Sequence, residues 1–79
     1  MKVNILYFAQ ISEKLGFSKE EFEIPDNMGS DALVEKLKVK YPELNELEFA
    51  VSVNQILVKA DTDLEEGFEI ALLPPFAGG

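Results

Sequence analysis

The 79-residue chain contains no cysteine, histidine or arginine. Without cysteine and histidine it has no thiol nucleophile, no disulfide and neither of the side chains that most often bind zinc. Its only basic side chains are seven lysines, set against fifteen acidic residues, for a formal net charge of −8. An acidic surface without arginine repels phosphate backbones, so we expect no nucleic-acid partner. A phosphorylated substrate would need another protein to hold its phosphate.

Long apolar runs are also missing. The stretch from Met1 to Gln10 contains none, so we expect neither a signal peptide nor a transmembrane span. The lack of cysteine fits a protein of the cytoplasm. Surface scaling for a chain of this size leaves about 8,000 Å² to bury on folding, which is enough for one thin core. We therefore expect a single domain without a deep catalytic cleft.

The alternation of apolar and polar residues predicts five strands. They are expected at residues 3–9, 17–24, 49–54, 56–58 and 68–73. A short helical turn at residues 11–15 is expected to end at Gly16, a residue typical of helix C-caps. The clearest helix begins near Gly29 or Ser30 and ends before Pro42.

One apolar stripe on that helix, carried by Leu33, Leu37 and Tyr41, requires a sheet to pack against. The order of two strands, a helix and three strands is that of a β-grasp, the ubiquitin-like α+β fold in which a mixed sheet curls around one main helix. We assign residues 1–75 to this domain and residues 76–79 to a flexible C-terminal Gly-Gly tail.

The period of two along the strands leaves several apolar side chains on the face opposite the core. In the first strand Val3, Ile5 and Tyr7 share one face with each other, and Leu6 and Phe8 share the other face with the polar Asn4. The same argument places these residues on the outer face: Leu57, Ala71 and Leu73. A contiguous patch of this kind marks a partner surface. The alternatives are that the alternation is displaced by one residue or that the helix covers this face.

The chain ends in two prolines followed by Phe76, Ala77, Gly78 and Gly79. Pro74 and Pro75 cannot donate to a strand ladder, so they end the last strand. The four residues after them could extend about 13 Å, far enough to enter another protein's active site. Terminal glycines let the last carbonyl pass a narrow channel. A terminus that is rich in glycine by chance is the plain alternative.

A C-terminal carboxylate has a pKa of about 3.5 and is a poor electrophile at neutral pH. ATP could activate it as an acyl-adenylate, and a sulfur donor could then displace AMP and leave a thiocarboxylate. The carrier itself needs no base, nucleophile or metal for this chemistry, and we expect no cofactor bound to the chain.

Other candidate sites have ordinary structural explanations. The acidic pair Glu65–Glu66, near Asp61 and Asp63, lacks the spacing of an EF-hand calcium loop. Tyr7 and Tyr41 are better explained as residues at the edge of the core than as catalytic phenols.

Several segments together resemble a known family, the small subunit of molybdopterin synthase, a MoaD-type ubiquitin-like sulfur carrier. They lie at residues 3–9, 32–33, 50–54, 64–67 and 70–75, and the ending Pro-Pro-x-x-Gly-Gly is the most specific of them. The resemblance covers nearly the whole chain.

This resemblance implies that a ubiquitin-activating-type (MoeB-like) enzyme adenylates Gly79, using ATP, and that Gly79 becomes a thiocarboxylate. It implies that the tail, from Pro74 and Pro75 through Phe76, Ala77 and Gly78, enters the large synthase subunit and gives sulfur to a cyclic pyranopterin precursor. Two carriers on a dimer of the large subunit would form a heterotetramer. The resemblance also places Phe8, Leu57 and Leu73 at the partner interface.

Three rival functions remain open from the sequence. A sulfur carrier for the thiazole of thiamine also ends in Gly-Gly but usually lacks the Leu-Pro-Pro sequence before the tail. A ubiquitin-like protein modifier would use the same activated Gly79 to form isopeptide bonds with lysines. A plain interaction module would have an inert tail.

Overall fold

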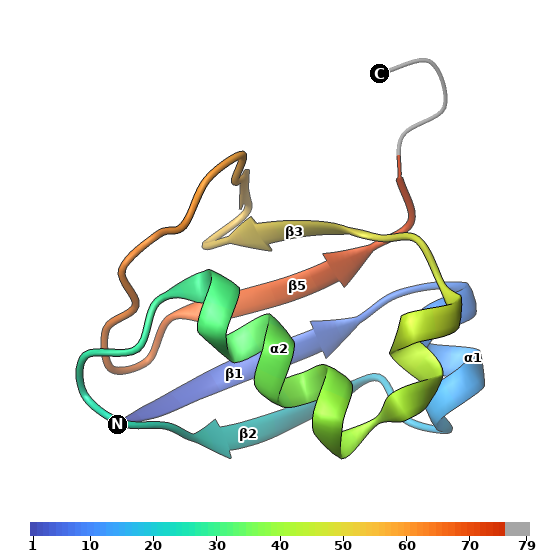
Figure 1. The fold of residues 1–79 in the computed structure, drawn as a ribbon, viewed down its shortest axis with the longest axis horizontal. Coiled ribbons are helices and arrows are strands. Elements are labelled where there is room, and N and C mark those ends of the chain that lie inside the picture. The colour runs from blue at the N-terminus through green and yellow to red at the C-terminus, as the bar shows by residue number, and fades with distance from the viewer. Residues whose placement is uncertain (76–79) are drawn as a thin grey trace.

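Five strands form one mixed sheet in the computed structural model, which describes residues 1–75 (Figure 1). The elements in chain order are β1 (Lys2–Tyr7), α1 (Gln10–Leu15), β2 (Lys19–Glu23), α2 (Ser30–Lys40), the 3₁₀ helix η1 (Pro42–Glu46), β3 (Ala50–Val53), β4 (Ile56–Leu57) and β5 (Glu69–Leu73). The strand order is β2-β1-β5-β3-β4, with β1 and β5 parallel and the other neighbours antiparallel. This is the β-grasp that the sequence predicts. Among residues 1–75, no helix combines the length and the apolar character needed to cross a membrane.

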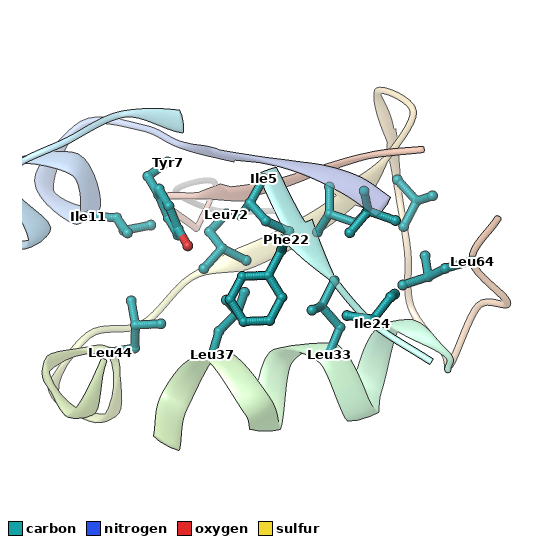
Figure 2. Packing of buried hydrophobic residues seen from close by; sticks show 13 residues of the cluster. Ile5, Tyr7, Ile11, Phe22, Ile24, Leu33, Leu37, Leu44, Leu64 and Leu72 are labelled. Atoms are coloured by element: carbon teal, nitrogen blue, oxygen red, sulfur yellow. The ribbon is translucent and has the colours of Figure 1, made fainter. Parts of the chain in front are cut away.

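The core lies between the inner face of the sheet and helix α2. Figure 2 shows Leu33 and Leu37 of α2 pointing toward Ile5 and Leu72 of the two central strands. All four side chains have no exposed surface. The alternation expected in β1 is confirmed, because Val3, Ile5 and Tyr7 are buried while Asn4 faces outward.

Helix α2 begins and ends where its sequence predicts. Its first turn is capped from the loop before β5, since the Asp61 Oδ1 oxygen accepts the Asp31 amide at 2.9 Å. Ser30 and Thr62 are joined twice, by the Ser30 amide to the Thr62 carbonyl and by the Thr62 amide to the Ser30 hydroxyl. A distant loop therefore supplies the N-terminal hydrogen bonds that Gly29, at the N-cap, cannot supply with a side chain.

The turn between β3 and β4 is shorter and tighter than expected. Asn54 was predicted as the end of a strand, but Asn54 and Gln55 both have positive φ, at 50° and 71°. A two-residue loop with both φ values positive matches the right-handed twist of a hairpin. Ile56, on the edge strand β4, is 71% exposed, although its alternation with Leu57 suggested an inward position.

Two further segments differ from the expectations. The second strand begins at Lys19, so Phe17 lies before it and packs edge-on against Tyr7 and Tyr41, with ring centroids 5.5 and 5.6 Å away. The polar segment after α2 contains η1, and its Leu44 is fully buried in the core. The segment around Leu44 has no regular spacing of apolar residues, so its place in the core is set by tertiary packing alone.

Candidate partner-binding site

The outer face of the sheet carries a row of side chains that crosses all five strands. The strand register aligns Lys19, Leu6, Ala71, Ser52 and Leu57. Ala71 and Ser52, in the two strands β5 and β3, are small, and the larger Leu6 and Leu57 stand on either side of them. A groove therefore follows from the order of residue sizes along this row.

The neighbouring row toward the ends of β1 and β5 is apolar. Phe8 extends the pairing of β1 with β5 through its amide, which donates to the Leu72 carbonyl at 3.2 Å, and Ala50 pairs with Leu73. Phe8 is 43% exposed and Leu57 is 44% exposed, while Leu73 is half-buried. Large apolar side chains this open to solvent in one contiguous patch indicate a surface that another protein covers.

These residues enclose a groove of about 570 Å³. Its lining is Leu6, Phe8, Ser52, Gln55, Leu57, Glu69, Ala71 and Leu73. All five residues that the alternation placed on the outer face are in this lining, so their predicted position is confirmed: Leu6, Phe8, Leu57, Ala71 and Leu73. Their role in binding a partner stays a prediction. Ala71, which lies between Leu6 and Ser52 in its row, is only 4% exposed.

The tail leaves the sheet at the apolar end of this groove. Leu73 is the last residue of β5, and the exposed Pro74 and Pro75 follow it. The predicted working residues Gly78 and Gly79, and the predicted contact residues Phe76 and Ala77, lie outside the described residues. The structure thus places the start of the tail beside Phe8 and Leu73, and the roles of residues 76–79 stay predictions.

Tyr7 and Tyr41 share one acceptor on the opposite side of the sheet. Their hydroxyls donate to the Glu20 Oε2 oxygen at 2.6 and 2.8 Å, and Lys40 Nζ lies 3.5 Å from Glu20 Oε1. Burial raises the pKa of the Tyr7 phenol, and the hydrogen bond to Glu20 raises it further. The pKa of Tyr41 is raised for the same two reasons. Protonated phenols that only donate to a carboxylate fit the structural role predicted for them.

The acidic loops form no metal centre within the described part of the chain, where no group of three potential carboxylate ligands comes together. Asp61 instead caps helix α2.

Fold and surface together define a ubiquitin-like β-grasp protein whose last strand leads from an apolar groove into a C-terminal tail. A family model described as the ThiS family matches residues 5–79, and the chain belongs to this family.

The chain also resembles several other proteins along nearly its whole length. A molybdopterin synthase sulfur carrier subunit of Mycobacterium tuberculosis is 35% identical, with all of this chain and 99% of that protein covered. A subunit 1 of a molybdopterin converting factor from Pyrococcus furiosus superposes with a TM-score of 0.89 at 26% identity, covering 96% of this chain and 99% of the other. A complex of subunits 1 and 2 of the molybdopterin-converting factor from Helicobacter pylori contains a chain with a TM-score of 0.72 at 26% identity, with complete coverage of both. The resemblance to the small subunit of molybdopterin synthase is confirmed.

Proposed function

We propose that this chain is the sulfur carrier subunit of molybdopterin synthase and that it carries sulfur as a thiocarboxylate on Gly79. The observation that carries the proposal is the position of the apolar groove, whose Phe8 and Leu73 lie where the chain leaves β5 toward Gly79. A partner that covers the groove would be held beside the tail. The similarity to molybdopterin synthase sulfur carrier subunits over the full chain supports this reading.

The chemistry requires only the terminal carboxylate from this chain. An adenylating enzyme of the ubiquitin-activating type would join Gly79 to AMP and release pyrophosphate from ATP. A sulfur donor would then displace AMP and leave the thiocarboxylate. Within the large subunit, the thiocarboxylate would give its sulfur to a cyclic pyranopterin precursor, and hydrolysis would return the carboxylate for another cycle.

The large subunit would hold the phosphate of that precursor, because this chain has no arginine and a net charge of −8. A dimer of the large subunit with one carrier on each side would form a heterotetramer. The cycle that we propose would run in the cytoplasm, where ATP is available, and a chain without cysteine is compatible with that compartment.

The mass of the intact protein tests the sulfur chemistry directly. After incubation with the activating enzyme, ATP and a sulfur donor, we expect a gain of about 16 Da, the difference between oxygen and sulfur in an activated acyl group. A variant lacking Gly79 should show no gain while keeping the thermal unfolding midpoint of the parent. No mass change with an activating enzyme that loads a known carrier would contradict the proposal.

A second assay separates molybdopterin synthesis from thiamine synthesis. The loaded carrier is mixed with the large synthase subunit and the pyranopterin precursor, or with the thiazole-forming enzyme and its substrates. We expect dithiolene to form in the first mixture and no thiazole in the second. The reverse result would assign the carrier to the thiazole branch.

A further inference from the structure

The groove on the outer face has one polar end. Among residues 1–75, Glu69 is the only charged residue of the lining, and it lies at the start of β5, opposite the end where Phe8 and Leu73 lie. No lysine nitrogen and no terminal amine of residues 1–75 comes within 4 Å of its carboxylate. A half-buried carboxylate without a cation, at the edge of an apolar groove, is open to a positive charge from outside.

A second polar group lies in the floor of the groove. Ser52 is 5% exposed, and its hydroxyl makes no hydrogen bond to any of residues 1–75. No side-chain oxygen or nitrogen among residues 1–75 is both buried and without a partner, so the Ser52 hydroxyl oxygen keeps contact with solvent in the groove. The register places Ser52 beside Ala71, midway between Glu69 and Leu73 along the groove. A ligand in the groove could take the place of that solvent and bond to the hydroxyl.

The three features follow one another along β5. Leu73 lies four positions after Glu69, which corresponds to roughly 13 Å along a strand. From the tail outward, the groove offers an apolar site at Phe8 and Leu73, a hydroxyl at Ser52 and a carboxylate at Glu69. This order has a direction, so a complementary segment can bind in only one orientation.

We propose that the groove binds a segment of the large synthase subunit that carries an apolar side chain next to the tail, a hydrogen-bonding group over Ser52 and a lysine or arginine at Glu69. This inference rests on the proposed function and adds the orientation of docking to it. The cation fixes which way the partner lies across the sheet and so directs the tail toward the partner's active site.

A second copy of this chain fits the groove less well. Each copy has a net charge of −8, and two grooves facing each other would add a second unpaired Glu69 to the first. Like charges brought together in this way oppose association. A basic partner removes this conflict because its cation pairs with the carboxylate.

The test measures the dissociation constant between the full-length chain and the purified large subunit from the same organism, by titration calorimetry at two salt concentrations. Charge reversal in Glu69→Lys should weaken binding at least about tenfold, and Glu69→Gln should weaken it less and reduce its dependence on salt. Ser52→Ala should weaken binding about threefold to tenfold, the range expected for one hydrogen bond. Glu46→Lys, an exposed residue of η1 outside the groove, makes the same charge change and should have little effect.

The outcomes separate this inference from the proposed function. Equal weakening by Glu69→Lys and Glu46→Lys would mean that only net charge matters and would overturn the specific pairing. If Glu69→Lys binds like the parent while Phe8→Asp does not bind, docking is purely apolar and the orienting cation is refuted. A parent chain that takes up sulfur but does not bind the large subunit would refute the proposed function itself. Dimerisation of the parent in light scattering, lost in Phe8→Asp, would assign the groove to a second copy.

Discussion

At the scale of single residues, Glu20 joins three parts of the structure. Its carboxylate accepts hydrogen bonds from Tyr7 in β1 and from Tyr41 after α2, and it pairs with Lys40 at the end of α2. Lys40 also lies over the ring of Phe22, 4.8 Å from its centroid. These hydrogen bonds and the ion pair hold the C-terminal end of α2 against the sheet, on the face away from the groove. It therefore bears on stability rather than on docking.

We expect this network to make the protein lose stability in alkaline solution. The pKa of Tyr7 is raised in the folded state by burial and by Glu20, whereas the unfolded chain ionises near pH 10. The stabilisation is fully present below about pH 10 and is lost as the pH rises above that value, since only the unfolded chain then releases the proton. Urea unfolding of the parent and of Tyr7→Phe between pH 7 and pH 11 checks this.

The Tyr7→Phe variant should lose about 1 kcal/mol at pH 7, the usual contribution of one hydrogen bond. Above about pH 10 its free energy of unfolding should fall less steeply than that of the parent. Tyr41 and Lys40, whose pKa values are also raised in the folded state, contribute to the remaining slope. Equal slopes for the two proteins would show that Tyr7 does not govern the alkaline transition.

At the scale of elements, helix α2 depends on a residue thirty positions away. Asp61 caps its first turn, so Asp61→Ala should lower the free energy of unfolding by about 1 kcal/mol. Asp61→Asn keeps an oxygen at the same place and should retain most of the stability. Urea denaturation of both variants measures the difference, and equal losses would point to the charge rather than the cap.

Gly29 is coupled to the same contact. A Cβ atom at this position would lie 2.6 Å from Asp61 Oδ1, so Gly29→Ala must displace the capping carboxylate. The φ of Gly29 is −97°, which any residue adopts, so the clash is the only cost. We expect Gly29→Ala to destabilise the parent but to have little effect when Asp61 is already alanine. Additive losses in this double-mutant cycle would contradict the coupling.

At the scale of the whole molecule, one face of the sheet forms the core and the other face is available for binding. The inner face is filled by α2, and the outer face presents the groove beside the tail. Phe8→Asp should therefore abolish binding to the large subunit, with a loss of at least about a hundredfold, because a buried unpaired charge opposes association. Thermal unfolding should change little, since Phe8 is 43% exposed.

Val39→Asp is the matched control for that variant. Val39 is 82% exposed and lies on α2, on the other side of the sheet, so the same type of substitution should leave the dissociation constant unchanged. Calorimetric titration with the large subunit compares the two. Equal loss in both variants would show that the outer face is not the docking surface.

Local residue patterns predicted most of the fold. The period of two in residues 3–9 and 68–73 identified the faces of β1 and β5, since every second side chain of a strand points the same way. Gly16, with a φ of 88°, ends α1 as expected because glycine adopts the left-handed region without steric cost. The burial of Leu44 in η1 had no such local signal.

The sequence by itself therefore determined the class of fold, the apolar residues of the outer face and the chemistry available at Gly79, because alternation and end-group chemistry are local properties. Only the tertiary structure decided that Leu6, Ala71, Ser52 and Leu57 form one row, since the register of four strands is a property of their pairing. It also decided that Glu69, at one end of the groove, has no cation partner among residues 1–75 and that Leu73 lies at the other end. Which charges find partners depends on distances across the sheet, and no segment of the chain contains that information alone.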